Sequence, residues 1–122
     1  MTIDVTDQTF ETEVLARSAE VAVVVDLWAP WCGPCKTLGP ILEKVIGATD
    51  GQVVLTKVNV DENPQTSAAF KVQSIPAVYA LKAGQVVDGF VGAQGEREVQ
   101  AFVDRLRPSE TEQEIDGLVT AG

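Results

Sequence analysis

Apolar side chains recur every three or four residues in three stretches of the chain, which is the spacing of one buried helix face. The first stretch follows Asp7, a suitable helix cap, and ends near Ser18. The second begins after the two cysteines and reaches about Ala48, and the third stops at Pro108. The repeating positions are Phe10, Val14 and Leu15; Leu38, Ile41, Leu42, Val45 and Ile46; and Val99, Phe102, Val103 and Leu106.

Two other stretches are rich in β-branched residues and predict strands. Residues 21–28 are almost wholly apolar, which is typical of a central strand that helices cover on both faces. Asp26 is the one polar residue in that stretch. Residues 53–60 alternate in character and predict a second strand.

The rest of the pattern predicts a short helix and a hairpin. Asn63 and Pro64 are suited to be the cap and the first residue of a helix that reaches about Phe70. Residues 76–81 and 86–91 are apolar runs joined by a short link that contains glycine, so they predict an antiparallel hairpin. Helices thus alternate with strands before the hairpin and the last helix, which predicts an α/β fold around one core.

Composition limits the function classes. The chain has 122 residues, 45% of them hydrophobic, and this length fits one domain. The longest purely apolar run, residues 21–25, is far shorter than the roughly 20 residues of a membrane span. The N-terminus has no basic and apolar leader, so we expect a cytoplasmic protein without a membrane partner. A net charge of −9 argues against nucleic-acid binding, which depends on Lys and Arg.

Residues 108–122 form an acidic tail that differs from the domain before it, which we expect to span residues 1–107. Ser109 and Glu112 fit a capping box, and apolar residues follow at helical spacing. These apolar residues are Ile115, Leu118 and Val119. The tail is therefore predicted to form a short amphipathic helix.

Cys32 and Cys35 are the only cysteines, and they lie between the apolar strand and the long helix. A structural staple is one interpretation, but so short a loop removes only ~1.9 kcal/mol of unfolded-state entropy. A zinc site needs four ligands, and the chain has two thiols and no histidine. A chance pair of buried thiols does not account for a position at a helix N-terminus, where N–H groups favour a thiolate.

That position predicts thiol–disulfide exchange. We expect Cys32, partly exposed at the start of the helix, to be the nucleophile. It attacks a substrate disulfide to give a mixed disulfide, and Cys35, one turn further in, resolves that bond and leaves a Cys32–Cys35 disulfide. Pro34 fixes the turn between the two thiols.

The nine residues 28–36, WAPWCGPCK, resemble the active-site motif of the thioredoxin family, and the resemblance covers about residues 3–107. Other matching positions follow in family order: Asp26, Lys57, Ile75, Pro76, Gly84 and Gly92. The resemblance implies a thioredoxin fold, in which helices flank a central mixed β-sheet. It also implies a protein-disulfide reductase whose working form is the reduced one.

Three residues acquire roles from this resemblance. Asp26 is implied to be a buried carboxylate behind the cysteines, with a raised pKa that lets it exchange a proton with Cys35; a water-facing Asp is the alternative. Lys57 is implied to neighbour Asp26 and tune that proton, the alternative being an ordinary exposed lysine. Pro76 is implied to carry a cis peptide bond facing the active site, which leaves the Ile75 backbone free to pair with a substrate strand.

The resemblance also implies how substrates and electrons reach the site. An apolar rim around Cys32 would bind substrate proteins, while Trp28 packs beneath the site. The implied rim consists of Trp31, Gly33, Pro34, Ile75, Gly92 and Ala93. No cofactor or metal is bound in the family; electrons come from NADPH through thioredoxin reductase, and the chain is expected to be a monomer.

A finer resemblance involves residues 87–94 and the tail. Together they look similar to the thioredoxin domain of tetratricopeptide-type co-chaperones, in which helical repeats follow the domain. Two functional interpretations therefore remain. A general reductase turns over when NADPH and a reductase recycle the cysteines, whereas a redox-capable client-binding domain forms mixed disulfides but recycles poorly.

Overall fold

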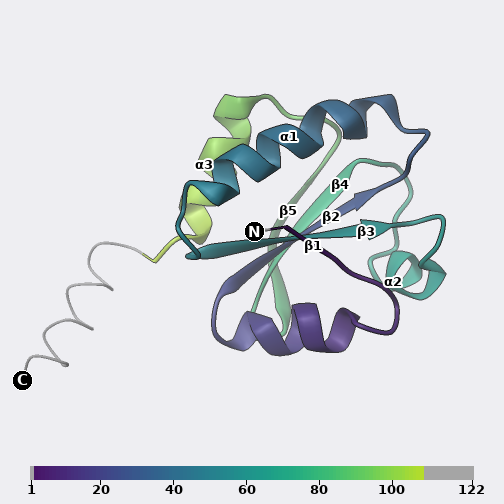
Figure 1. The fold of residues 1–122 in the computed structure, drawn as a ribbon, viewed down its shortest axis with the longest axis horizontal. Helices are drawn as coiled ribbons and strands as arrows, with labels where there is room; N and C mark the ends of the chain where they lie inside the picture. Colours follow the sequence, from purple (N-terminus) through teal and green to yellow (C-terminus); the bar gives the residue numbers. More distant parts are fainter. Residues whose placement is uncertain (1, 109–122) are drawn as a thin grey trace, which may run out of the picture.

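A five-stranded mixed β-sheet forms the centre of the molecule, and the computed structural model describes residues 2–108 (Figure 1). The strand order is β1-β3-β2-β4-β5. β3 runs parallel to both β1 and β2, whereas β4 is antiparallel to β2 and β5 is antiparallel to β4. The strands are β1 (Thr2–Asp4), β2 (Ala22–Trp28), β3 (Val53–Asn59), β4 (Ala77–Lys82) and β5 (Gln85–Val91).

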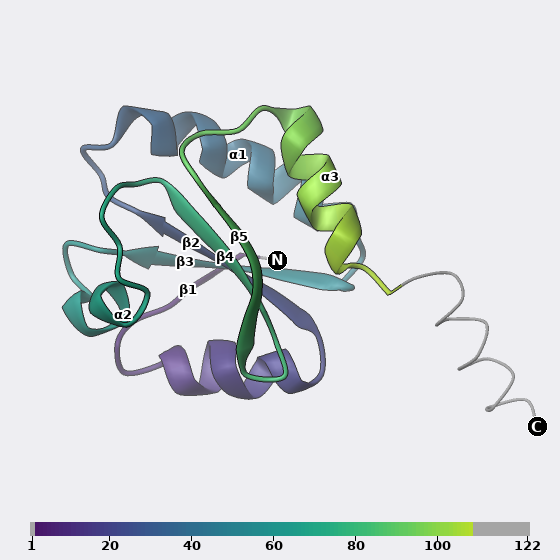
Figure 2. The same ribbon diagram turned by 180° about the vertical axis from the view of Figure 1, so that it is seen from behind.

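Helices cover both faces of this sheet (Figures 1 and 2). α1 (Gly33–Gly47) and α3 (Glu96–Leu106) lie side by side on one face. The short helices η1 (Glu11–Ala16) and η2 (Arg17–Ala19) lie on the other, and α2 (Pro64–Ala69) joins β3 to the loop before β4. The predicted α/β class, a mixed sheet flanked by helices, is confirmed.

The central strand β2 is buried on both of its faces, as its apolar sequence predicts. Val24 packs with residues of α1 and α3, whereas Val23 and Val25 pack with residues of η1. Because side chains alternate along a strand, Asp26 and Trp28 share the face of Val24 and point towards α1. The fold therefore places Asp26 on the same side of the sheet as the helix that carries Cys35.

The N-terminal segment differs from the sequence pattern in two ways. The pattern does not predict β1, because three residues are too few to show a period. Asp7 does not cap the first helix; its carboxylate accepts hydrogen bonds from the Gln65 N–H at 3.2 Å and from the Thr66 N–H and hydroxyl at 2.8 Å each. Asn63 is the N-cap residue of α2 as expected, but its side chain makes no capping bond; its Oδ1 accepts a hydrogen bond from the Asp7 N–H at 2.9 Å.

The other predicted elements agree with the structure to within a few residues. The hairpin forms between β4 and β5, and α3 ends before Pro108. The helix predicted for the tail falls within residues 109–122, outside the described part of the chain. Among residues 2–108, no helix combines the length and apolar character needed to cross a membrane.

Candidate active site

The two cysteines lie at the N-terminal end of α1. Cys32 is the N-cap residue and has extended backbone angles, φ −86° and ψ 105°, so the chain leaves β2 and turns directly into the helix. Pro34 occupies the first turn of α1, where the missing N–H of proline leaves no hydrogen bond unmade. Cys35 follows one residue later, and its Cα lies 5.3 Å from that of Cys32.

A disulfide joins the two sulfur atoms, so the structure represents the oxidised form. The Cys35 N–H donates a hydrogen bond to Cys32 Sγ at 3.2 Å, which is the contact that a side chain at the N-cap makes. The same N–H, together with the helix dipole, is aimed at Cys32 Sγ and stabilises negative charge on it after reduction.

The sequence suggests that Cys32 is more exposed than Cys35, but the two cysteines are almost equally buried. Cys32 is 3% exposed and Cys35 is 5% exposed, so the expectation of a partly exposed Cys32 is wrong for the oxidised form. The reason is that both thiols are packed in one small cluster with Ala29 and with parts of Trp28, Val60 and Ile75. What distinguishes Cys32 is its N-cap position.

The expected rim is apolar and partly open to solvent. Trp31 is 69% exposed, and its indole N–H donates a hydrogen bond to Asp61 Oδ2 at 2.9 Å. Gly33 and Pro34 are also exposed beside it, and Ile75 packs against the cysteine cluster. A hollow of about 220 Å³ opens between Trp31 and the segment that leads into β4, with Val60, Val72 and Ile75 in its wall.

The second part of the expected rim lies after β5. The peptide bond between Ile75 and Pro76 is cis. Gly92, which has a φ of 92°, donates its N–H to the Pro76 carbonyl at 2.8 Å, and this bond holds the two segments together. Ala93 follows with its side chain exposed.

Asp26 is the buried titratable group nearest to this machinery along the chain. It is 1% exposed, and its Oδ1 has no hydrogen-bond partner within the part of the chain that the structure describes. Burial raises the pKa of Asp26 to about 6, because a carboxylate loses its hydration there. The positive charge of Lys57 opposes that rise, and the negative charge of Glu43 adds to it.

Lys57 lies directly opposite Asp26 in the register of β2 and β3. Its ammonium sits over the Trp28 ring, 5.1 Å from the centroid, and 3.9 Å from Glu43 Oε1. Trp28 in turn packs against the cysteine cluster. Lys57 therefore lies beside both Asp26 and Trp28, and Trp28 connects this pair to the cysteines.

Sequence reasoning missed three contributors. Val60 and Asp61 follow β3, whose carboxyl end meets that of β2 at one edge of the sheet; that shared edge is the signal that could have identified them. Glu43 is a half-exposed residue of α1, and only its contact with Lys57 marks it out.

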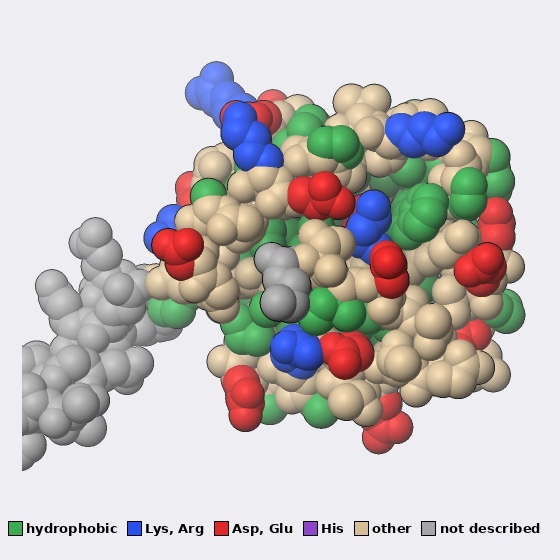
Figure 3. Space-filling model, in the orientation of Figure 1, with side chains coloured by type: hydrophobic (Ala, Val, Ile, Leu, Met, Phe, Trp, Pro, Cys, Tyr) green, Lys and Arg blue, Asp and Glu red, His purple; other side chains and the backbone are tan. Residues whose placement is uncertain are grey.

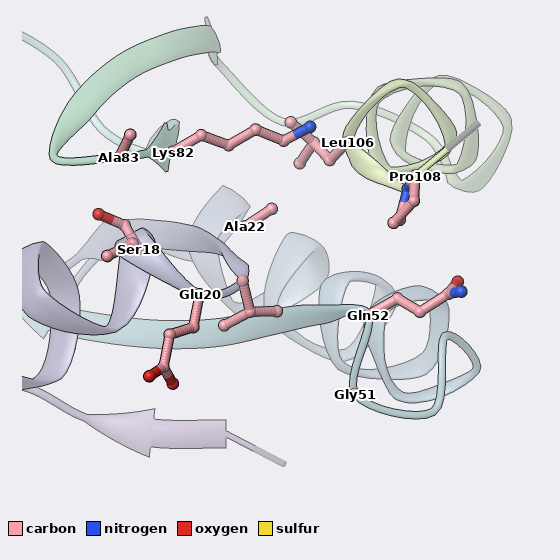
Figure 4. Close-up of a pocket in the computed structure, with 11 residues that line it drawn as sticks. Ser18, Glu20, Ala22, Gly51, Gln52, Lys82, Ala83, Leu106 and Pro108 are labelled. Atoms are coloured by element: carbon pink, nitrogen blue, oxygen red, sulfur yellow. The ribbon is translucent and has the colours of Figure 1, made fainter. Parts of the chain in front are cut away.

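A larger hollow lies at the opposite end of β2 and carries none of this chemistry. It measures about 440 Å³ and is bordered by η2, the loop after α1, the end of β4 and the end of α3. Figure 4 shows Lys82 extended along its upper wall towards Leu106, whereas Glu20 points away from Lys82. Neither cysteine lines this hollow, so the thiol–disulfide pair lies outside it. Residues 2–108 also contain no group of three or more His, Cys, Asp or Glu suited to a metal ion.

Comparison with known proteins points to one family. Residues 1–105 match the thioredoxin family model. The chain is 44% identical over 90 residues to Thioredoxin 2 of Chlorobaculum tepidum, a match that covers 74% of this chain and 81% of that protein. It is 41% identical over 101 residues to a thioredoxin of Chlorobaculum thiosulfatiphilum, covering 83% and 92%. It is 46% identical over 89 residues to the mitochondrial thioredoxin of Bos taurus, covering 73% and 54%.

The disulfide at the start of α1 and the mixed sheet behind it define a thiol–disulfide oxidoreductase. This class of protein carries its redox group in its own two cysteines and needs no bound cofactor. The chain belongs to the thioredoxin family. Membership implies protein disulfides as substrates and a reductase as partner.

Proposed function

We propose that the protein reduces protein disulfides, with Cys32 as the nucleophile and Cys35 as the resolving thiol. The hydrogen bond from the Cys35 N–H to Cys32 Sγ carries this assignment, because it favours the thiolate at residue 32 rather than at residue 35. Cys35 lies inside the first turn of α1 with its Cα 5.3 Å from that of Cys32, so it is placed to attack Cys32 Sγ once that sulfur is bonded to a substrate.

The reaction proceeds in two exchanges. The Cys32 thiolate attacks one sulfur of the substrate disulfide; a Cys32–substrate bond forms, and the other substrate sulfur leaves as a thiolate that takes a proton from water. Cys35 then loses its proton and attacks Cys32 Sγ. The mixed disulfide breaks, the second substrate sulfur leaves and is protonated, and the Cys32–Cys35 disulfide remains. The substrate gains two electrons and two protons, and the two cysteines supply the electrons.

Asp26 is the proposed acceptor of the Cys35 proton. Its pKa of about 6 leaves it mostly ionised at neutral pH, yet close enough to neutrality for it to hold a proton transiently. Its position on the α1 side of β2 and its unpaired Oδ1 support this role. Lys57, opposite Asp26, keeps the pKa from rising further, which is the tuning role that we assign to it.

Substrate proteins are proposed to dock on the apolar rim around the cysteines. The exposed Trp31 ring and the adjoining hollow offer an apolar surface for side chains that flank the substrate disulfide. The Ile75 backbone next to Pro76 is proposed to pair with an extended substrate segment by β-strand addition. Gly33, Pro34, Gly92 and Ala93 complete the proposed rim.

The remaining proposals concern context. We assign a cytoplasmic location, a monomeric state and a supply of electrons from NADPH through thioredoxin reductase, which two-electron exchange with a second dithiol can provide. The co-chaperone alternative gains no support from the relatives described above, all of which are thioredoxins. Its sequence basis includes the tail, which lies outside the described residues, so we do not propose it.

Two variants test the assignment of the cysteines. The assay is insulin reduction coupled to NADPH oxidation by a bacterial thioredoxin reductase. The wild type should turn over and Cys32→Ser should not. Cys35→Ser should accumulate a mixed disulfide with insulin, which non-reducing gel electrophoresis detects, because nothing resolves the bond. If Cys32→Ser traps substrate and Cys35→Ser does not, the two roles are reversed.

A further inference from the structure

Lys57 has more carboxylates around it than the one, Asp26, that the proposed mechanism uses. β3 lies between β1 and β2, and the register pairs Lys57 with Asp4 on one side and with Asp26 on the other. Neighbouring side chains in register share one face of a sheet about 5 Å apart. Three charged residues therefore form a row on the face of the sheet that carries α1, with the lysine in the middle and the exposed Asp4 at one end.

α1 adds a third carboxylate above this row. Glu43 Oε1 lies 3.9 Å from Lys57 Nζ, and among the ion pairs of the described residues Lys57 pairs with Glu43 and not with Asp26. The ammonium lies close beneath the helix, since a Cβ built on Gly39 would come within 3.6 Å of Nζ. Figure 3 shows basic and acidic side chains interspersed on the face over α1 and the β1–β3 edge.

The charged groups around Asp26 come from few elements. β3 contributes Lys57 and α1 contributes Glu43, whereas β4 places the apolar Val78 opposite Asp26. Asp4 of β1 is separated from Asp26 by Lys57. Glu62 lines a solvent-open hollow of about 310 Å³ that Lys57 and Trp28 also border. Glu43 is thus the acid that both contacts Lys57 and acts on Asp26.

We propose that Glu43 is a positioning residue for the redox site: it holds the Lys57 ammonium towards α1 and limits its pairing with Asp26. The expected consequence is that Asp26 keeps its proton to a higher pH. The proposal rests on the proton role assigned to Asp26 above. Lys57 is only 22% exposed, whereas Glu43 is 48% exposed, so the glutamate can be changed without disturbing the core. Its own negative charge acts in the same direction as its hold on Lys57.

Glu43→Gln is the decisive variant, because it keeps the shape of the side chain and removes the charge. Lys57 is then free to turn to Asp26, and the titration midpoint of the Asp26 carboxyl should fall by about half a pH unit, in keeping with a half-exposed ion pair. Glu96→Gln is the matched control. It removes one carboxylate from α3 that pairs with Lys44 at 2.9 Å, so net charge changes equally without removing the ion-pair partner of Lys57.

The measurement is an NMR titration of the Asp26 carboxyl carbon in the oxidised protein, with both variants repeated in a Lys57→Gln background. A fall in Glu43→Gln, none in Glu96→Gln and a smaller fall without Lys57 support the proposal. An unchanged midpoint in Glu43→Gln, an equal fall in Glu96→Gln, or a fall of the same size without Lys57 overturns it.

The pH profile of insulin reduction separates this inference from the proposed function. If the midpoint of Asp26 falls in Glu43→Gln and the acidic limb of the profile moves with it, the positioning role of Glu43 and the proton role of Asp26 are both supported. If the midpoint falls while the profile stays in place, Glu43 positions Lys57 as proposed and the proton role of Asp26 fails.

Discussion

Replacing Asp26 with asparagine should make the oxidised protein more stable at neutral pH. The folded protein holds this carboxyl at a pKa of about 6, compared with an ordinary value of 3.8. The unfolded chain therefore ionises first as the pH rises, and the folded state loses stability between about pH 4 and pH 6 to 7. Above that range the loss is complete and corresponds to ~3 kcal/mol.

Asparagine cannot ionise, so Asp26→Asn removes this loss. Its amide also needs buried hydrogen-bond partners, which adds a term that does not depend on pH. The informative quantity is therefore the change with pH in the difference between the two unfolding free energies, not that difference at one pH. It should grow by ~2–3 kcal/mol between pH 4 and pH 7.5 and then level off.

Guanidinium unfolding of the oxidised wild type and Asp26→Asn, followed by tryptophan fluorescence at intervals of half a pH unit, measures this difference directly. All other titrating groups are common to both proteins and cancel. A difference that stays constant from pH 4 to pH 8 refutes the raised pKa and, with it, the physical basis for a proton on Asp26 near neutrality.

Three further substitutions test other parts of the structure. Asp7→Asn should lower the melting temperature at pH 7, and this effect should shrink as the pH falls below 3.8, because burial raises the pKa of Asp7 but hydrogen bonds from α2 outweigh it and hold the pKa below 3.8; thermal unfolding at pH 7 and at steps below pH 3.8 checks it. Gly89→Ala should destabilise the protein by ~1–3 kcal/mol in urea unfolding, since its Cβ would lie 2.7 Å from Tyr79 Cδ1. Trp31→Phe removes the indole bond to Asp61 at 2.9 Å from a ring that is 69% exposed, so it should raise the KM for insulin and leave stability within ~0.5 kcal/mol.

The sequence predicts those parts of the fold whose residues carry a repeating pattern. β2 is recognisable because burial on both faces demands a continuous apolar run, and Asp26 is the one polar residue that interrupts it. The cysteines are recognisable because a strand–helix junction is a distinctive place for two thiols. β1 is not predictable, because three residues joined to β3 have no period of their own.

Contacts between distant parts of the chain are what the pattern does not contain. Asp7 looks like the cap of the helix that follows it, yet it caps α2, 58 residues further on, because folding brings the two segments together. Glu43 looks like any exposed helical glutamate, and its contact with Lys57 depends on how α1 sits on the sheet. Local pattern identifies the elements, whereas the electrostatics of the site arise from their packing.

The ionised Asp26 carboxylate lowers the stability of the folded protein, and we expect it to raise the rate of disulfide reduction. At pH 7 the ionised carboxylate can take the proton of Cys35, and Asp26→Asn cannot. We expect turnover with insulin to fall at least about tenfold, less than the ~10²–10⁴ typical of a general base, because water can also carry the proton. Alkylation of reduced Cys32 by iodoacetamide should keep its rate, since the N–H of residue 35 still faces Sγ. Unchanged turnover in a variant that has gained the expected stability means that the buried charge serves no proton transfer, and that its energetic cost needs another explanation.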